Sequence, residues 1–348
     1  MNFRQTIGMI KPADEEAMRL SRKRWDSIAK PLHSLGKLEE AVIKLAGIQG
    51  THKVKLDKKA LVIMCADNGV VEEGVTQTDN SVTAIVAENF LDCKTSVAVM
   101  ADNLGVDLYA YDVGMVRDTR VEKRKVAYGT KNLAKGPAMT RDECIKTIET
   151  GINIVFELKE KGYDIITTGE MGIGNTTTSS AVGAVLLNQP VEIMTGKGAG
   201  LSDEGLKHKM DIIRQSIELN KPNPEDPIDV LAKVGGFDIC GLVGVFLGGA
   251  AAGISVVIDG FISSVAALAA TRLAPLAKDY IFPSHVSKEP AGRFMLEAMD
   301  MEQFLTCDMC LGEGTGAVML IPVIACGLEV YNRMSTFDDI EIEAYVEL

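Results

Sequence analysis

The chain has 348 residues, 47% of them hydrophobic, which is enough for one large α/β domain with an appended piece or for two domains. Its 36 Lys and Arg residues against 48 Asp and Glu residues give a net charge of −12, which argues against a nucleic-acid partner, because phosphate backbones are bound by clustered positive charge. Any phosphate that this protein binds must therefore be held by a local site.

The first part of the chain is predicted to be helical. Its N-terminus, MNFRQTIGMIKPADEE, lacks the basic-then-apolar pattern of a signal peptide, and the seven scattered cysteines suit a reducing compartment, so we expect a cytoplasmic protein. Residues 12–50 carry apolar side chains at helical spacing, namely Leu35, Leu38, Val42, Leu45 and Ile48. We expect this helical start, residues 1–50, to pack with the helical end, about 290–348, as a small bundle.

From residue 60 the sequence changes to short apolar runs separated by helix-length stretches. The runs are ALVIMCAD, VDLYAYDVG, YDIITTGE, ISVVIDG and YIFPSH. Apolar strands without polar alternation predict an α/β fold with a parallel sheet covered by helices on both faces. Ligands bind beyond the carboxyl ends of such strands, where Asp67, Asp112, Glu170, Asp259 and His285 fall. The alternative for each residue is that polar side chains simply begin where a strand leaves the core.

The stretch GEMGIGNTT, residues 169–177, looks ready to hold an anion. Gly172 and Gly174 allow a tight turn after a strand, and Asn175 or Thr176 is predicted to cap the helix that follows. No charged residue occurs between Asn175 and Leu187. The N-terminus of this helix, which carries a partial positive charge, is therefore suited to bind a phosphate. The loop lacks the third glycine of GxGxxG and the lysine of a P-loop, and a simple strand-to-helix turn is the alternative.

A second flexible backbone stretch, GKGAG at residues 196–200, includes Gly198 and precedes a predicted helix with Lys209 on the flank of its apolar face. Lys209 is either a solvated lysine or a cation directed at a phosphate.

Residues 239–258, ICGLVGVFLGGAAAGISVVI, are uncharged over a length that can cross a bilayer. The glycines, the break at Gly253 and the flanking Asp238 and Asp259 instead predict a close-packed helix followed by a buried strand, with no membrane contact. Cys307 and Cys310 form the one CxxC pair, and no second pair or matching histidines accompany them, so we predict no metal site.

A second glycine loop, LGEGTG at residues 311–316, repeats the combination of glycines with a glutamate. A carboxylate near a bound phosphate is repelled unless it handles a proton or meets positive charge during the reaction. Sugar transfer at an anomeric carbon supplies both, because the transition state is cationic and the nucleophile must lose a proton. Glu170 and Glu313 therefore indicate transfer of a phosphoribosyl unit. The alternative for Glu313 is a glutamate hydrogen-bonded to its own loop.

Several stretches together resemble one known family, the nicotinate-nucleotide:dimethylbenzimidazole phosphoribosyltransferases of cobamide lower-ligand synthesis. These stretches, in family order, are CADNGVVEEGV at 65–75, GEMGIGNTT at 169–177, PNPEDPIDVLAKVGGFDICGLVG at 222–244, IDGFISSVAALAA at 258–270, PSHVSKE at 283–289 and LGEGTGA at 311–317. They run through most of the chain, and jointly they are highly specific.

The resemblance implies a pentosyltransferase with a Rossmann-like parallel sheet, a large catalytic α/β domain at 51–289, a small helical domain from 1–50 and 290–348, and a dimer. It implies transfer of the 5-phosphoribosyl group from nicotinate mononucleotide to an aromatic base, which releases nicotinate and inverts the anomeric carbon to an α-ribotide. No cofactor and no metal are implied.

The resemblance also assigns site residues. Glu313 would be the general base that takes the proton of the nucleophile, and Glu170 would face the ribose and the developing positive charge. The phosphate and ribose would be held by Gly172, Asn175, Thr176, Gly198, Lys209 and Ser287. The base pocket would include Thr78, Val86 and Leu311.

Several residues differ from those that are common in the family, and these differences affect which acceptor we expect. Asn68 stands where the family commonly has histidine, Leu32-His33 replaces the usual Pro-Gly, and Val86 falls where benzimidazole-using relatives can place a polar side chain. Some relatives activate phenol or p-cresol and work as two unequal paralogous subunits. The acceptor is therefore 5,6-dimethylbenzimidazole, a related base or a phenol, and the enzyme is a homodimer or a heterodimer. The alternative function is a noncatalytic paralogous subunit of a heterodimeric phosphoribosyltransferase.

Overall fold

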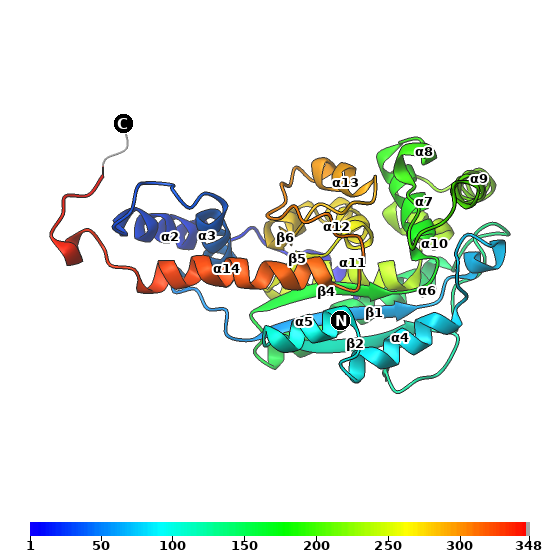
Figure 1. Ribbon diagram of the computed structural model, residues 1–348, viewed down its shortest axis with the longest axis horizontal. Helices are drawn as coiled ribbons and strands as arrows, with labels where there is room; N and C mark the ends of the chain where they lie inside the picture. Colours follow the sequence, from blue (N-terminus) through cyan, green and yellow to red (C-terminus); the bar gives the residue numbers. More distant parts are fainter. Residues whose placement is uncertain (346–348) are drawn as a thin grey trace.

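Six parallel strands form the centre of the computed structural model, which describes residues 1–345 (Figure 1). The strands are β1 (Lys59–Ala66), β2 (Asp107–Gly114), β3 (Glu122–Lys123), β4 (Ile165–Met171), β5 (Ser255–Ile258) and β6 (Ile281–Pro283). All five predicted strands are present, so the predicted parallel α/β sheet is confirmed. The edge strand β3 was not predicted, because two exposed polar residues carry no apolar signal.

The strand order is β3-β2-β1-β4-β5-β6. The chain moves outward in one direction from β1 to β3 and in the other direction from β4 to β6, so the order reverses between β1 and β4. In register, Met64 of β1 pairs with Tyr111 of β2 and with Glu170 of β4. A crevice at the carboxyl ends of the strands follows from this reversal, and it is where α/β sheets bind ligands.

Helices cover the sheet on both sides. Figure 1 shows α4 (Ser81–Leu91) and α5 (Ser96–Asn103) on one side and α11 (Phe237–Ala252) and α12 (Phe261–Leu273) on the other. Because both faces are covered, the strands carry apolar residues without alternation. The remaining short or peripheral helices are α1 (Phe3–Met9), η1 (Gly69–Glu73), α7 (Asn175–Leu187), α8 (Val191–Met194), α9 (Asp203–Asn220), α10 (Pro227–Val234), η2 (Pro275–Tyr280), α13 (Gly292–Ala298) and η3 (Asp338–Ile340).

The glycine-rich helix α11 packs closely against α6 (Arg141–Glu160). A Cβ atom at Gly244 would lie 2.0 Å from the Ile148 carbonyl oxygen, and one at Gly151 would lie 2.1 Å from the Gly241 carbonyl oxygen. Only glycine permits this approach of two helix backbones. The prediction of a close-packed helix followed by a buried strand at 239–258 is therefore confirmed by α11 and β5.

At the ends of the chain, α2 (Glu15–Ser27) and α3 (Lys37–Gln49) pack beside α14 (Thr315–Arg333). The Trp25 and Tyr331 rings meet edge to face, with centroids 5.1 Å apart. Among the described residues, α14 is the one helix long and apolar enough to cross a membrane, and more than half of that stretch is buried inside the protein, as in a core helix. Near the start of α3, His33 has a left-handed backbone with φ of 56°, a conformation that glycine adopts with less strain.

Candidate active site

A cavity of about 280 Å³ lies at the carboxyl ends of β4, β5 and β6. Its wall is formed by the start of α7, the start of α12, the loop before α14 and one residue of α4. Nine predicted site residues line it: Glu170, Gly172, Asn175, Thr176, Gly198, Ser287, Val86, Leu311 and Glu313. The structure thus brings together segments that are far apart in the sequence.

The two glycine loops that carry glutamates, residues 169–177 and 311–316, touch each other. A Cβ atom at Gly169 would lie 2.3 Å from the Glu313 carbonyl oxygen, so the strand β4 backbone packs directly on the second loop. A Cβ atom at Gly312 would lie 2.7 Å from the Glu170 Oε1 atom. Glycines at 169 and 312 therefore let each glutamate lie against the backbone of the other loop.

The second loop has an unusual backbone conformation. Gly312, Glu313 and Gly314 have φ values of 88°, 61° and 102°, so three consecutive residues are left-handed. A side chain at such a position costs about 1 kcal/mol or more, and a glutamate is tolerated there only because its surroundings fix it. Glu313 is thus held in a strained backbone conformation between two glycines.

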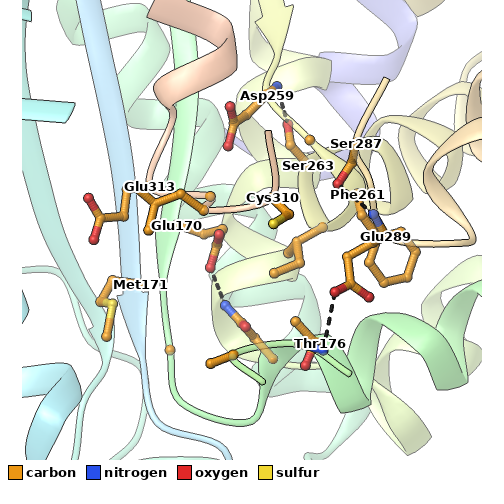
Figure 2. A pocket seen from close by; sticks show the side chains of 18 of the residues that line it. Glu170, Met171, Thr176, Asp259, Phe261, Ser263, Ser287, Glu289, Cys310 and Glu313 are labelled. Atoms are coloured by element: carbon orange, nitrogen blue, oxygen red, sulfur yellow. Dashed lines mark hydrogen bonds between the residues drawn. The ribbon is translucent and has the colours of Figure 1, made fainter. Parts of the chain in front are cut away.

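Glu170 is buried, with 7% of its surface exposed, and its carboxylate accepts a hydrogen bond from the Asn175 side-chain amide (Figure 2). Burial and the nearby carboxylates of Asp238 and Asp259 raise the pKa of Glu170 to about 8, while the Asn175 hydrogen bond lowers it. Glu170 therefore takes up or releases a proton near neutral pH.

Glu313 is half-buried, and Figure 2 shows its carboxylate turned away from that of Glu170. Its Oε2 atom is buried and has no hydrogen-bond partner within the described residues. Burial raises the pKa of Glu313, the backbone N–H of Val97 lowers it, and the charge of Asp259 raises it further. A carboxylate with a free oxygen at a cavity wall is suited to accept a proton.

The first turn of α7 differs from the prediction. Its N-cap is Gly174 in a left-handed conformation, without a side-chain cap, so the predicted capping by Asn175 or Thr176 is wrong. Asn175 donates instead to Glu170, and Thr176 Oγ1 accepts a hydrogen bond 2.9 Å from Lys209 Nζ. Both side chains face the cavity rather than their own helix.

Lys209 stands directly behind the cavity wall. Only 1% of its surface is exposed, and its ammonium group also donates to the Gly196 carbonyl oxygen at 3.2 Å. Burial lowers the pKa of Lys209 to about 8, and the charge of Glu289 raises it. The interpretation as a solvated lysine is excluded by this burial.

Glu289 is a site residue that the sequence analysis did not name. Its Oε1 atom accepts a hydrogen bond from the Gly198 N–H at 3.1 Å, and it lies beside Thr176 at the edge of the cavity (Figure 2). Glu289 belongs to the PSHVSKE stretch that also contains Ser287, but its contact with Gly198, 91 positions away, has no local signal in the sequence. A carboxylate thus occupies one of the donors that we expect to hold a phosphate, the Gly198 N–H.

Asp259 and His285 also line the cavity. The sequence places both at predicted strand ends and indicates no specific role for either. Asp259 lies at the end of β5 and accepts hydrogen bonds from backbone N–H groups at the start of α14.

The two predicted apolar pocket residues that line the cavity are Val86 of α4 and Leu311, of which Leu311 is exposed. Thr78 does not line it. Thr78 is exposed in the loop before α4, where its carbonyl oxygen accepts a hydrogen bond from the Thr76 hydroxyl at 2.7 Å. Within residues 1–345 there is no group of three or more His, Cys, Asp or Glu side chains placed to hold a metal ion.

Comparisons with known proteins agree with this arrangement. A family model described as phosphoribosyltransferase matches residues 10–342. The nicotinate-nucleotide–dimethylbenzimidazole phosphoribosyltransferases of Ruminiclostridium cellulolyticum and Acetivibrio thermocellus are each 52% identical to the chain, over 100% and 98% of both sequences. The crystal structure of CobT from Thermus thermophilus superposes with a TM-score of 0.89 at 37% identity and covers 94% of this chain and 99% of that one. The chain therefore belongs to the nicotinate-nucleotide–dimethylbenzimidazole phosphoribosyltransferase family and is a pentosyltransferase.

Proposed function

We propose that the protein transfers the 5-phosphoribosyl group of nicotinate mononucleotide to the aromatic base of a cobamide lower ligand, giving an α-ribotide and nicotinate. One observation carries this proposal. Two glutamates with raised pKa values share a cavity with a group of anion-binding donors, and the cavity lies where parallel α/β sheets bind ligands.

The phosphate is proposed to bind where Gly198, Thr176 and Lys209 converge. Lys209 Nζ lies 3.5 Å from the position of a Cβ atom at Gly198, and Gly198 has a left-handed φ of 55° that turns its backbone toward the cavity. The N-terminus of α7 has no acid in its first turn, so its partial positive charge is available. Ser287 lines the same end of the cavity.

Glu313 is proposed to be the general base. It removes the proton from the ring nitrogen or hydroxyl of the acceptor, whose electron pair then forms the new bond to the anomeric carbon. The bond from that carbon to the nicotinate nitrogen breaks, and its electron pair leaves with nicotinate. Attack from the face opposite to nicotinate inverts the carbon.

Glu170 is proposed to stabilise the positive charge of the sugar. Before the substrate binds, a carboxyl group with a pKa of about 8 is mostly protonated at neutral pH. The cationic nicotinate ring and the developing oxocarbenium ion favour its ionised form, so the negative charge becomes available when the substrate is bound. The Asn175 hydrogen bond holds the carboxylate in place.

The acceptor is proposed to lie between Val86 and Leu311, because apolar side chains suit a flat aromatic ring. Glu313 serves an imidazole N–H and a phenol O–H equally well. The decisive experiment incubates the purified chain with nicotinate mononucleotide and a panel of benzimidazoles, purines and phenols, and identifies the ribotides by mass. Formation of no ribotide by the chain alone, with activity restored by a neighbouring paralogue, would support the noncatalytic subunit instead.

The Glu313→Gln variant tests the base. We expect its turnover to fall by roughly 10²-fold to 10⁴-fold while the KM for nicotinate mononucleotide stays within about threefold, because the amide cannot accept the proton. Glu302→Gln, which alters an exposed glutamate paired with Lys37, is the matched control and should keep full activity. Turnover of Glu313→Gln within a few-fold of the wild type would remove Glu313 from this role.

We further propose that the protein works as a homodimer or heterodimer in the cytoplasm, with 51–289 as the catalytic domain and 1–50 with 290–348 as a helical domain. All seven cysteines are free thiols, which supports a reducing compartment. The packing of α2 and α3 beside α14 supports the helical domain, although α13 lies against α12 near the cavity. Size measurement in solution and limited proteolysis test the dimer and the boundaries.

A further inference from the structure

The carboxylate of Asp259 binds three backbone N–H groups of one segment. Its Oδ1 atom accepts from Gly316 at 2.7 Å and from Ala317 at 3.2 Å, and its Oδ2 atom accepts from Gly314 at 3.1 Å. Asp259 is only 2% exposed. Such a buried carboxylate with several backbone donors is fixed in position, because every bond to it is charge-assisted.

These donors belong to the start of α14, which has no cap of its own. The N-cap residue of this helix is Gly314, which has no side chain, and the first turn contains no acid. Asp259 therefore supplies the missing cap from the end of β5, and it links the central sheet to α14. The N–H groups of a helix start that would otherwise be unpaired are satisfied by this single side chain.

Glu313 immediately precedes that N-cap. Its left-handed backbone is held on one side by β4, through the contact of Gly169 with the Glu313 carbonyl oxygen. On the other side it is held by the bond from the Gly314 N–H to Asp259. The two contacts come from neighbouring strands, so the backbone of Glu313 is fixed between β4 and β5.

His285 closes the remaining direction. A Cβ atom at Gly316 would lie 2.0 Å from His285 Cδ2 and 3.0 Å from Asp259 Oδ1. The first turn of α14, which follows the loop, thus packs directly on His285 at the end of β6. His285 itself is oriented by a contact of 3.1 Å between its Nδ1 atom and the Val286 carbonyl oxygen.

We propose that Asp259 is a positioning residue for the phosphoribosyl transfer, which holds the loop of Glu313 so that the Glu313 carboxylate reaches the acceptor. The proposal rests on the role of Glu313 given above. It goes beyond that role because Asp259 acts through backbone groups of a distant segment of the chain and needs no contact with the acceptor.

The charge of Asp259 also affects the pKa of Glu313. The charged or polar groups around Glu313 and Asp259 are Glu170 on β4, His285 after β6 and the Val97 N–H on α5. The negative charge of Asp259 raises the pKa of Glu313, so its removal lowers that pKa. A base of lower pKa is deprotonated down to a lower pH.

The variant Asp259→Asn tests the proposal, with Asp164→Asn as control. Asp164 also holds a distant segment of backbone, because its Oδ2 atom accepts from the N–H groups of Asp57 at 2.8 Å and Lys58 at 2.9 Å, but it precedes β4, at the end of the strand opposite to the cavity. For Asp259→Asn we expect turnover to fall by roughly 10-fold to 100-fold, with KM for nicotinate mononucleotide within about threefold. The acidic limb of the turnover profile should move to lower pH. Asp164→Asn should leave turnover within about threefold.

A double variant separates positioning from simple damage to the fold. In Glu313→Gln, where the base is already absent, adding Asp259→Asn should cause less than about a threefold further loss. A full multiplicative loss in the double variant, an unmoved acidic limb, or an equal loss of turnover in Asp164→Asn would overturn the proposal.

Amide hydrogen exchange of the wild type gives a test that does not depend on the folding of any variant. The Gly314, Gly316 and Ala317 amides should exchange slowly, because Asp259 holds them, and rapid exchange at these amides would overturn the anchoring. Absence of ribotide formation by the wild type would instead count against the proposed reaction, and the exchange result would still decide whether the loop is anchored.

Discussion

The carboxylate of Glu289 lies in the proposed phosphate-binding site. Glu289 accepts the Gly198 N–H and balances the buried charge of Lys209, so in the free protein it does what a phosphate would do. Its Oε2 atom is buried without a hydrogen-bond partner within the described residues. Two anions cannot share these donors without strong repulsion, so the phosphate of the substrate must displace Glu289.

Glu289→Gln is therefore expected to improve substrate binding. The charge of Glu289 raises the pKa of Lys209, which is about 8 in the wild type, so its removal lowers that pKa. The kinetics are therefore compared at about pH 6, where the lysine is charged and the competing anion is gone. The KM for nicotinate mononucleotide should fall by roughly threefold to tenfold with turnover little changed, as measured by steady-state kinetics. Titration calorimetry with ribose 5-phosphate should show tighter binding, and Glu297→Gln, an exposed change on α13, is the control. A raised KM would mean that Glu289 helps to hold the substrate.

At the scale of elements, the crossing of α6 and α11 fixes the layer beneath the sheet. The glycines at this crossing bring the two backbones into contact, and α11 in turn packs on strands of the sheet. The buried Asp238 at the start of α11 lies beside Gly172, so the position of this helix also shapes the loop after β4. The crossing is thus part of the support of the cavity.

The variant Gly244→Ala should lower the free energy of unfolding by about 3 kcal/mol or more, because its Cβ atom would lie 2.0 Å from the Ile148 carbonyl oxygen and the helices must separate. Gly8→Ala in α1, where a Cβ atom meets nothing within 4 Å, should change it by less than about 1 kcal/mol, in the stabilising direction. Urea unfolding of both variants checks the difference. Equal stabilities would contradict the close packing.

Elements were predictable from the sequence where the physical signal is local. Buried parallel strands are continuous apolar runs, and α11 is marked by glycines between two acids. The polar edge strand β3 has no such signal, and the predicted cap of α7 was wrong because Asn175 is used by Glu170 instead. The roles of Asp259 and Glu289 depend on contacts with Gly314 and Gly198, residues 55 and 91 positions away, and no local pattern encodes them.

At the scale of the whole molecule, several of the acidic residues are concentrated at the cavity. Glu170, Asp238 and Asp259 are all buried near the carboxyl ends of the strands, and each has a raised pKa for which burial is the largest cause. Burying carboxylates together opposes folding whenever they are ionised. The fold therefore carries an energetic cost at the cavity that the large apolar core must offset.

A dependence of stability on pH follows. The folded-state pKa of Glu170 is about 8 and its ordinary value is 4.5, so the folded protein holds this proton more tightly and loses stability as pH rises from about 5 to 8. Glu170→Gln keeps an acceptor for Asn175 and removes the charge. The difference in free energy of unfolding between Glu170→Gln and the wild type should therefore increase, in favour of the variant, by roughly 3 kcal/mol from about pH 5 to about pH 8. A constant difference across this range, measured by thermal unfolding, would contradict the raised pKa.

The helix α14 has a consequence for how distant parts of the protein affect catalysis. Its 19 residues span about 28 Å, with the Glu313 loop at one end and Tyr331, packed on Trp25 of α2, at the other. One rigid element therefore joins the terminal helices to the edge of the cavity, where Asp259 and β4 hold its first turn and the residue before it. Pro322 lies inside the helix and cannot donate one of its internal hydrogen bonds. The order of the Glu313 loop and the packing of the chain ends are thus parts of one continuous structure.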